Sequence, residues 1–372
     1  MQSIKTLCLR KIPQKDVTLF ENNIVASNIP ILLEWNPFNY VSTFHMRKKC
    51  SKECFYTSDK SLEPFADMLT VNFGNPLLKN IPKSRNENRM NVFICYESPL
   101  HRPLYKEAPK DYFNITVTYR LDSDVTMLYD FFEPVSDASK AWDQDEVNKI
   151  IDEKTNPALY FVSHCDTPSK RELIVEELKK YINITQYGNC NKKFCEKGGD
   201  CEIKDIRSHY FTLAFENSDC VDYVTEKVYR LRKLIVPIIL NRNILRGIHA
   251  KLNPYVIALS DFKTVKELAD FLKYLMKNKV EYSKYLEWTK FYKKVQPKDL
   301  IDDVQCELCE IAWKKKFGYR KVIPDIHQWW GNNNCHDLFG SILDKQGYMK
   351  FMLDIKLRTY DEQFKHSFHV IM

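Results

Sequence analysis

The sequence predicts an α/β protein of two domains, each built around a parallel β-sheet. The chain has 372 residues, 44% of them hydrophobic, which is enough apolar material for two globular cores. Short apolar runs alternate with amphipathic stretches, the pattern produced by βαβ units with parallel sheets. The polar segment Asp143–Pro157 separates an earlier group of elements from a later one, and we interpret it as the interdomain linker.

Six short apolar runs are predicted to be strands. They are Ile31–Leu33, Asn91–Tyr96, Ala158–Val162, Tyr210–Phe215, Ile235–Leu240 and Tyr255–Leu259. Two sets of apolar residues have helical spacing. These are Ile174, Leu178 and Tyr181, and then Val265, Leu268, Leu272 and Leu275. Thr264, with Glu267 three residues later, forms a capping-box pattern that predicts the start of the second helix.

The charge of the chain is modest and evenly mixed. Its 56 Lys and Arg stand among 49 Asp and Glu, giving a formal net charge of +7. Such mixing does not indicate a nucleic-acid-binding face, while a local basic site for a phosphate-bearing small molecule stays open.

Cysteine usage and two sequons indicate an oxidising, glycosylating compartment. The chain has 12 cysteines, most of them clustered. The clusters are Cys50 with Cys54; Cys190, Cys195, Cys201 and Cys220; and Cys306, Cys309 and Cys335. The N-x-[ST] sequons begin at Asn114 and Asn183. Against this, Met1–Asn23 is polar and no apolar run reaches the roughly 18 residues that a membrane helix needs.

The segment from Phe215 to Lys227 has features of a diphosphate site. A predicted strand ends at Phe215 and helix-compatible sequence begins near Asp222, so the loop lies where open α/β sheets place ligands. A helix N-terminus there would direct N–H groups at an anion, and Lys227 adds a full charge. The simpler alternative is a capped surface helix. The chain has nine glycines and no G-x-G-x-x-G or Walker loop, so side chains and helix ends would have to hold a nucleotide.

The same segment resembles the donor-binding signature of the α1,3/4-fucosyltransferases, glycosyltransferase family ten. That signature runs F-E-N-S, then D-Y-[IV]-T-E-K, then V-P-[IV]-[IV]-L, and this chain matches it at Phe215–Ser218, Asp222–Lys227 and Val236–Leu240. Further segments resemble the family between about Ile31 and Cys335. They are Ile31–Phe38, Tyr96–Pro99, Phe113–Asp124, Tyr160–Arg171 with His164 in place of the usual Asn, and Tyr187–Cys190.

The resemblance implies a GT-B fold, two Rossmann-like domains facing across a cleft. Residues 1–29 would be a stem remnant, 30–150 the acceptor domain, 151–300 the GDP-fucose domain, and 301–372 a C-terminal cysteine-containing segment and tail. It implies an inverting transfer of L-fucose from GDP-fucose to a GlcNAc hydroxyl, most often O3. The acceptor glycan is an N-glycan core or an antenna. The implied location is the Golgi lumen, with membrane attachment only through an anchor that is missing from this chain.

The family's roles can be placed on single residues of this chain. Glu97 would be the base that takes the proton from the acceptor hydroxyl. Arg171 and Lys227 would stabilise the charge on the departing β-phosphate. The further donor-binding residues are Tyr223, Glu226, Asn217 and Ser163. Without the resemblance, Glu97 reads as an ordinary strand-end acid and Arg171 as a surface arginine at a helix start.

No metal is expected in the reaction. Asp122-Ser123-Asp124 has the D-x-D form of a divalent-metal site, but such triplets occur by chance and family ten resembles metal-independent enzymes. We therefore expect no required cofactor besides the donor substrate, and a divalent cation to be at most stimulatory.

The cysteines of Cys306-Glu307-Leu308-Cys309 leave three alternatives: a redox pair, half of a zinc site with Cys50 and Cys54, or disulfides. The resemblance implies disulfides from Cys50 and Cys54 to Cys306 and Cys309, in undetermined order. Cys190, Cys195, Cys201 and Cys220 are expected to form one or two more. Cys95, inside a strand, is expected to be a buried free thiol.

The acceptor side departs most from the family pattern. Leu69–Gly74 lacks the family's histidines, Asn241 replaces a glycine, and Arg232–Leu234 replaces small residues. A changed acceptor and a weak or silent GDP-fucose-binding paralogue both fit these departures. A third hypothesis, a disulfide-stapled secreted interaction module, is disfavoured by the α/β alternation.

Overall fold

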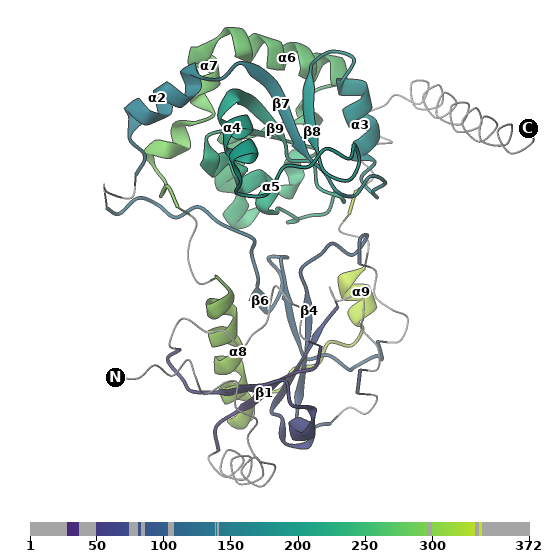
Figure 1. Ribbon diagram of the computed structural model, residues 1–372. Helices are drawn as coiled ribbons and strands as arrows, with labels where there is room; N and C mark the ends of the chain where they lie inside the picture. Colours follow the sequence, from purple (N-terminus) through teal and green to yellow (C-terminus); the bar gives the residue numbers. More distant parts are fainter. Residues whose placement is uncertain are drawn as a thin grey trace, which may run out of the picture. The chain divides into compact units, whose positions relative to one another are not determined.

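The computed structural model describes residues 28–36, 50–73, 81–82, 86–102, 108–137, 139, 141–295, 300–331 and 335–336. The chain divides into two compact units (Figure 1). Unit 1 comprises Met1–Leu128 and Lys298–Gly331, and unit 2 comprises Tyr129–Pro297 and Asn332–Met372. The chain therefore leaves unit 1, builds unit 2, returns to unit 1 and then enters unit 2 again, where Cys335 and His336 are described.

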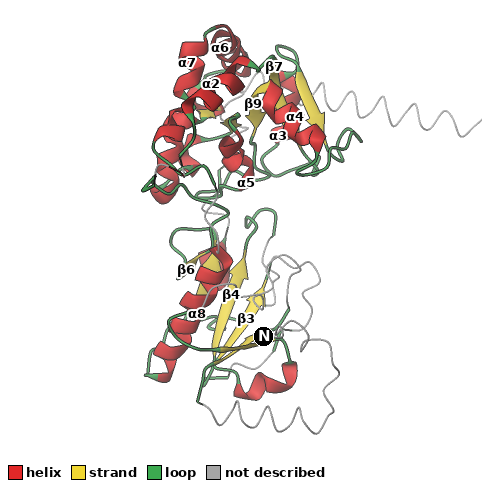
Figure 2. Cartoon of the chain, turned by 60° about the vertical axis from the view of Figure 1, so that its left-hand side comes forward, coloured by secondary structure: helices red, strands yellow, loops and turns green. Residues whose placement is uncertain are grey.

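Unit 1 contains a six-stranded parallel sheet (Figure 2). Its strands are β1 (Ile31–Glu34), β2 (Phe55–Thr57), β3 (Met68–Asn72), β4 (Met90–Cys95), β5 (Ile115–Thr118) and β6 (Val125–Thr126). Their spatial order is β2-β1-β3-β4-β5-β6. The helices are the 3-10 helix η2 (Lys60–Phe65) and the α-helices α8 (Leu300–Lys316) and α9 (Ile326–Trp330).

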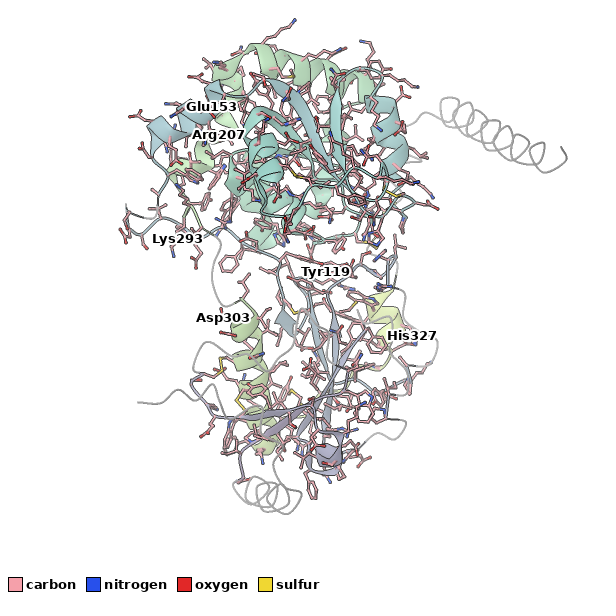
Figure 3. The ribbon with its side chains drawn as sticks, viewed as in Figure 1. Tyr119, Glu153, Arg207, Lys293, Asp303 and His327 are labelled. Atoms are coloured by element: carbon pink, nitrogen blue, oxygen red, sulfur yellow. A yellow bond between two sulfur atoms is a disulfide. The ribbon has the colours of Figure 1, made fainter. Side chains whose placement is uncertain are left out.

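Alternate residues of β4 face different helices of unit 1. Val92 and Ile94 share an apolar cluster with Leu308 of α8. Phe93, which lies between them in the strand, meets Trp330 of α9 with ring centroids 5.3 Å apart. Tyr119, labelled in Figure 3, packs edge-on against the same Trp330 at 5.9 Å. Because side chains alternate along a strand, β4 is buried on both faces and reads as a continuous apolar run.

Unit 2 contains a five-stranded parallel sheet in the order β11-β10-β9-β7-β8. Its strands are β7 (Asn156–Phe161), β8 (Ile184–Tyr187), β9 (His209–Leu213), β10 (Val236–Ile239) and β11 (Ile257–Ala258). Its helices are α2 (Gln144–Asp152), α3 (Arg171–Leu178), α4 (Asp200–Ser208), α5 (Glu226–Tyr229), α6 (Val265–Lys277) and α7 (Lys279–Lys284), with the 3-10 helices η4 (Arg230–Lys233), η5 (Arg242–Ile244), η6 (Gly247–Tyr255), η7 (Leu259–Asp261) and η8 (Glu287–Lys290).

The first five strands of each unit, counted along the chain, have the same order in space, 2-1-3-4-5. This is the flavodoxin-like order of doubly wound folds, in which ligands bind where the direction of strand addition reverses. The predicted α/β class with two parallel-sheet units is confirmed. In unit 1 the reversal lies between β1 and β3, and in unit 2 between β7 and β9.

The predicted linker at Asp143–Pro157 is corrected, because the units divide after Leu128. Most of that segment forms α2 and the start of β7. Glu153 just after α2 pairs with Arg207 of α4, both labelled in Figure 3. The apolar face of α2 is buried in the core of unit 2 through Val147, Ile150 and Ile151. The segment is polar because only one face of a surface helix is apolar.

The described part of residues 301–372 does not form a separate segment. Helices α8 and α9 belong to unit 1, and disulfides Cys50–Cys306 and Cys54–Cys309 join α8 to the start of the chain. These bridges confirm the pairing that the resemblance implied and settle its order.

Three further disulfides lie in unit 2: Cys165–Cys190, Cys195–Cys201 and Cys220–Cys335. Cys190, Cys195, Cys201 and Cys220 take part in bridges as expected, but the bridges number three and not one or two, because Cys165 and Cys335 are the partners of Cys190 and Cys220. Cys95 is buried and free, as predicted.

All six predicted strands are confirmed, with ends shifted by a few residues. The two predicted helices are α3 and α6, and the Thr264 hydroxyl accepts from the N–H of Glu267 at 3.1 Å. The stem remnant lies almost wholly outside the described residues. Among the residues that are described, no helix has the length and apolar character needed to cross a bilayer.

Candidate functional site

The loops that follow β7 and β9 are locked together at the reversal point of unit 2. After β7, the Ser169 hydroxyl donates to the backbone oxygen of Glu216 at 2.7 Å, and the Ser169 N–H donates to the oxygen of Asn217 at 3.0 Å. Arg171, the first residue of α3, donates from Nη1 to the Phe215 oxygen at 2.6 Å and from Nη2 to the His164 oxygen at 3.2 Å. Two loops from neighbouring strands therefore form one rigid rim.

Arg171 is buried, being 3% exposed. Its Nε has no hydrogen-bond partner among the described residues. Because both terminal nitrogens are engaged by carbonyl oxygens, the guanidinium lies beneath the rim, and among the described residues no carboxylate forms an ion pair with it. Its burial excludes the alternative interpretation of Arg171 as a surface arginine, while its predicted role at the donor stays a prediction.

Lys227 lies at the same rim, held by a buried carboxylate. Its Nζ donates to Glu216 Oε2 at 2.8 Å and to Thr225 Oγ1 at 3.0 Å. Glu216 Oε1 accepts from both the N–H and the hydroxyl of Thr225, at 3.0 and 2.6 Å. Glu216 is 3% exposed. This one carboxylate therefore fixes the turn into α5 and the position of the lysine.

Opposing effects act on the protonation of Lys227. Burial favours the neutral amine, but the carboxylates of Glu216 and Glu226 outweigh it and raise the pKa of Lys227 above its usual value. Burial likewise favours neutral Glu226, and Lys227 outweighs it, so the pKa of Glu226 is lowered. The lysine is thus held as a cation.

The helix after the signature begins later than predicted. Asp222 has φ +63°, in the left-handed region, so it belongs to a turn and not to a helix. Helix α5 starts at Glu226, with Thr225 as its N-cap, and is only four residues long. A single turn has almost no macrodipole, so the predicted helix N-terminus does not supply the positive field. That field comes from the two cationic side chains.

The remaining predicted donor residues differ in exposure. Ser163 follows β7 and is exposed, and the side chain of Glu226 is 51% exposed. Asn217 lies in the locked rim and is buried. Tyr223 is 1% exposed, and its ring meets that of Tyr129 edge-on at 6.4 Å. Unit 2 thus carries all six predicted donor residues in the loops after β7 and β9 and in the first residues of the helices that follow them, α3 and α5.

The loop after β8 is drawn onto the same edge. Gly188 has φ +115°, and a Cβ there would lie 2.0 Å from the backbone oxygen of Val162. Only glycine permits this approach. The disulfide Cys165–Cys190 then joins the loops after β7 and β8.

Glu97, the predicted base, lies in unit 1 two residues after the end of β4 and is half-buried. The turn that follows it is well fixed: Ser98 is fully buried and its hydroxyl accepts from the N–H of His101 at 3.2 Å. The predicted position at a strand's carboxyl end is thus confirmed. Its role as base stays a prediction.

The acidic triplet of unit 1 is engaged in structure. Asp122 accepts from Arg120 Nε at 2.8 Å and from Nη2 at 2.5 Å. Asp124 Oδ2 accepts from the N–H of Thr116 at 2.9 Å, and its Oδ1 pairs with Lys321. Both carboxylates therefore fix the β5–β6 turn.

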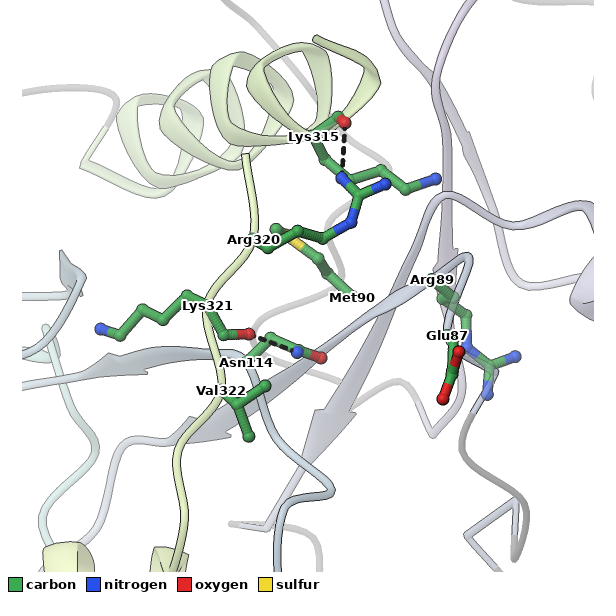
Figure 4. A pocket seen from close by; sticks show the side chains of 8 residues that line it. All are labelled: Glu87, Arg89, Met90, Asn114, Lys315, Arg320, Lys321 and Val322. Atoms are coloured by element: carbon green, nitrogen blue, oxygen red, sulfur yellow. Dashed lines mark hydrogen bonds between the residues drawn. The ribbon is translucent and has the colours of Figure 1, made fainter. Parts of the chain in front are cut away.

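Asn114 is corrected as a glycosylation site. It is 5% exposed, and its Nδ2, the atom that would carry a glycan, donates to the Lys321 oxygen at 2.6 Å (Figure 4). It lines a cavity of about 250 Å³. Three cations of this cavity, Arg89, Lys315 and Lys321, each pair with a carboxylate, and the fourth, Arg320, donates to backbone oxygens. A glycan is incompatible with this packing. Asn183 is exposed and stays a candidate.

Glu216 and Ser169 are the functional residues that sequence reasoning missed. Glu216 stood in the matched signature, but a buried acid bonded to a lysine leaves no trace in spacing alone. Ser169 forms its bonds across 47 and 48 positions, and no periodic pattern reports such a contact.

Two family models match the chain. The model described as glycosyltransferase family 10 (fucosyltransferase) C-term matches residues 151–329, and the model described as fucosyltransferase, N-terminal matches residues 27–130.

Curated proteins are similar over most of the chain. Alpha-(1,3)-fucosyltransferase fut-1 of Caenorhabditis elegans is 31% identical, covering 86% of this chain and 74% of that protein. Alpha-(1,3)-fucosyltransferase C of Drosophila melanogaster is 30% identical over 69% of this chain and 63% of that protein. GDP-fucose protein O-fucosyltransferase 3 of Xenopus laevis is 28% identical over 80% of this chain and 64% of that protein. A crystal structure of an alpha1,3-fucosyltransferase with GDP-fucose aligns with a TM-score of 0.49 at 14% identity, covering 80% of this chain and 92% of that one.

Proposed function

Because the chain belongs to glycosyltransferase family 10, the fucosyltransferases, we propose that it transfers L-fucose from GDP-fucose to O3 of a GlcNAc residue on a glycoprotein glycan, with inversion. The observation that carries the proposal is the cationic rim at the reversal point of unit 2. There Glu216 and Thr225 hold Lys227, and Arg171 lies beneath the same loops. This is the edge at which doubly wound folds bind ligands.

In this proposal Lys227 contacts the diphosphate and Arg171 acts from beneath the rim. As the bond from the anomeric carbon to the phosphate oxygen breaks, the electron pair leaves with GDP and charge builds on the β-phosphate. Fixed cations stabilise that developing charge without having to reorganise. Ser163 and Glu226 are exposed enough to contact the donor, and the buried Tyr223 and Asn217 support the loops.

Glu97 is proposed as the base. Its carboxylate takes the proton from the acceptor hydroxyl while that oxygen forms its bond to the anomeric carbon from the face opposite GDP, which inverts the configuration. The donor and the acceptor hydroxyl are then the only reactants, and no metal or cofactor is required.

The test is an assay of the purified chain with labelled GDP-fucose and a panel of acceptors: lactosamine, an N-glycan core and a protein. Wild-type enzyme is expected to fucosylate a GlcNAc-containing acceptor, also in excess chelator. Lys227→Ala is expected to lower kcat by about 10²–10³-fold, since removing one preformed charge stabiliser has an effect of this order. Lys273→Ala, an exposed lysine of α6, is the matched control.

Two results would overturn the proposal. Wild-type turnover in Lys227→Ala would remove the donor assignment. Binding of GDP-fucose without transfer to any acceptor would support the alternative of a silent donor-binding paralogue.

A second candidate acceptor is a protein hydroxyl. The relative from Xenopus laevis, described as a GDP-fucose protein O-fucosyltransferase, matches 80% of this chain. Label on the protein that resists removal of its N-glycans would favour this candidate over a glycan acceptor.

The compartment proposed for this reaction is the Golgi lumen. Five disulfides among the described residues support an oxidising location. Expression of the natural protein with a fluorescent tag, followed by co-localisation with a Golgi marker, tests this location.

A further inference from the structure

Helix α8 of unit 1 ends in a group of basic residues. From Lys314 to Lys321 the chain reads Lys-Lys-Lys-Phe-Gly-Tyr-Arg-Lys. Gly318 has φ +96°, in the left-handed region that commonly ends helices, and its N–H donates to the Lys315 oxygen at 3.0 Å. The N–H of Tyr319 likewise donates back to the Lys314 oxygen at 3.0 Å. The chain therefore turns at Gly318, and the cations on both sides of the turn stay close together.

Three of these cations, together with Arg89, line the cavity of about 250 Å³ in unit 1 (Figure 4). They are Lys315, Arg320 and Lys321. The cavity lies at the amino ends of two parallel strands, because Met90 begins β4 and Asn114 precedes β5. Glu97 follows the carboxyl end of β4. The cavity is therefore at the opposite edge of the sheet from the proposed base, and the proposed reaction does not use it.

The lysines around this cavity are only partly neutralised. Lys315 and Lys316 share one carboxylate, that of Asp67, with Nζ–O distances of 2.8 and 3.5 Å. Lys321 pairs with Asp124. The two lysines at Asp67 thus leave one positive charge in excess.

Arg320 and Lys314 add two exposed charges. Arg320 donates from Nη1 to the backbone oxygens of Lys315 and Tyr319, at 2.9 and 2.8 Å. Among the described residues, no carboxylate forms an ion pair with Arg320 or with Lys314, and both side chains are exposed. Glu87 is the one carboxylate on the cavity wall. The surface therefore has a net positive charge, and the guanidinium of Arg320 is held in place by backbone oxygens that do not neutralise it.

The same turn exposes aromatic side chains. Phe317 is 80% exposed, more than any other large apolar side chain among the described residues, and Tyr319 is 40% exposed. The ring of Phe317 stacks on Trp313, with centroids 6.3 Å apart and an interplanar angle of 24°. Lysines in a last helical turn complement the partial negative charge of the helix end, which would explain the cations alone. It does not explain a phenyl ring in water at their centre.

We propose that this surface, Lys314 to Val322 with the adjoining cavity, binds the surface of an anionic lipid bilayer. Phe317 inserts between the lipid head groups, and Arg320 holds a lipid phosphate at the mouth of the cavity. Cations around an exposed aromatic residue are typical of segments that lie in a membrane interface. A guanidinium binds a phosphate with two parallel hydrogen bonds. A sulfated polysaccharide or an acidic peptide would pair with the cations but would leave the phenyl ring without a function.

The test is cosedimentation of the purified chain with vesicles of phosphatidylcholine, alone or mixed with phosphatidylserine. The wild-type chain is expected to bind the mixed vesicles and to be released by salt, because salt screens the attraction between exposed cations and an anionic surface. Binding to phosphatidylcholine alone is expected to be at least about tenfold weaker, since it lacks that attraction.

Two variants test the two parts of the surface. The double variant Lys314→Gln with Arg320→Gln should lower the partition coefficient by about 25-fold, since each cation near an anionic leaflet strengthens binding by about fivefold. Lys251→Gln with Lys277→Gln, which removes two exposed cations of unit 2, is its matched control and should bind as wild type does.

Phe317→Ser should lower the partition coefficient by about tenfold, the effect of a partly buried phenyl ring. Phe194→Ser, at a phenylalanine of unit 2 that is 71% exposed, is the control and should have no effect. Insertion is read separately with Phe317→Trp, whose added fluorescence should be quenched by brominated phosphatidylcholine in the mixed vesicles. All the substituted side chains are exposed, so each variant should unfold at the temperature of wild type.

Several results would overturn the inference. One is a wild-type chain that does not sediment with the mixed vesicles, and another is sedimentation that Phe317→Ser and the double variant leave unchanged. Retention on heparin without binding to vesicles would assign the surface to a sulfated polysaccharide instead. Binding of inorganic phosphate in calorimetry without binding to vesicles would reduce the cavity to a site for the free ion. The proposed function is unaffected by each of these results, because Glu97 and the donor loops lie elsewhere in the fold.

Discussion

Units 1 and 2 have the same strand order but different side chains at their reversal points. In each, a residue after the first strand holds backbone at the end of the third. In unit 1 this is Asn36, whose Nδ2 donates to the Asn72 oxygen at 2.7 Å and whose Oδ1 accepts from the Asn72 N–H at 2.9 Å. In unit 2 it is Arg171 with Ser169, which bind the oxygens of Phe215 and Glu216.

This difference between the two clamps separates the residues required by the strand topology from those required by the proposed chemistry. Both sheets require their loops to be clamped where strand addition reverses, and a neutral amide satisfies that need in unit 1. Unit 2 uses a buried guanidinium and adds Lys227, so its clamp also creates a positive site. The fold fixes where a ligand can bind, and the side chains decide which ligand. The four predictions that follow test this separation.

The largest expected effect belongs to Glu97→Gln in unit 1. If unit 1 supplies the base and unit 2 the donor site, kcat should fall by about 10²–10⁴-fold, the usual contribution of general base catalysis, with GDP-fucose affinity unchanged. Steady-state kinetics and calorimetry with GDP-fucose measure the two quantities. Glu53→Gln, an exposed acid of unit 1, is the control. A parallel loss of donor binding would place Glu97 in the donor site instead.

Next in size is Glu216→Gln. The amide keeps the shape but loses the charge that counters burial, so the pKa of Lys227 should fall. The alkaline limb of GDP binding should then move to lower pH, with kcat about tenfold lower because the lysine is less firmly placed. The pH profile of GDP affinity is the measurement. Glu226→Gln, whose oxygen lies 3.7 Å from Lys227 Nζ, should shift the limb less, and an unmoved limb in Glu216→Gln contradicts the clamp.

The long buried strands could be predicted from the sequence, and the signature could be recognised in it. Features that depend on contacts between residues far apart in the chain could not be predicted. The strand β4 was found because burial on both faces makes it continuously apolar. The short edge strand β2 has three residues, too few to show a period. The start of α5 was misplaced because residues Asp222 to Thr225 are compatible with a helix in composition while the chain bends through a left-handed turn.

Prediction of the site was limited in the same way, by contacts between residues far apart in the chain. Residue types in the signature were enough to predict which loops carry the proposed donor residues, whereas the partners of Cys165 and Cys335 and the burial of Asn114 depend on neighbours far along the chain. Glu216 shows the limit most clearly. Its position was read correctly, but its two bonded oxygens become visible only in the folded loop.

The third prediction concerns the acid stability of unit 2 and not its activity. Burial lowers the pKa of His249 to about 4, from an ordinary value near 6.5. The unfolded chain therefore binds a proton that the folded chain does not, and stability should fall as the pH drops from about 6.5 to 4, by up to about 3 kcal/mol. Hydrogen exchange of unit 2 peptides against pH measures this.

The control for that prediction is His249→Gln. In this variant the protection of unit 2 amides from hydrogen exchange should decrease less over the same pH range. The difference between the two proteins isolates the imidazole from Asp130 and Asp219, whose pKa values are raised by burial and act in the opposite direction. Parallel curves for the two proteins would exclude the imidazole as the cause.

The smallest effect is expected for the neutral clamp itself. Asn36→Ala removes two hydrogen bonds to the backbone of Asn72 and should lower the free energy of unfolding by about 1–2 kcal/mol, with GDP-fucose affinity unchanged. Ser169→Ala should cost a similar amount of stability by freeing the Glu216 oxygen, but it should also weaken GDP-fucose binding, because the loop it releases carries Glu216 and hence Lys227. Denaturant unfolding and calorimetry on both variants decide the matter. If both variants leave GDP-fucose affinity unchanged, the hydrogen bonds of Ser169 contribute only to stability. Lys227 then keeps its position without them.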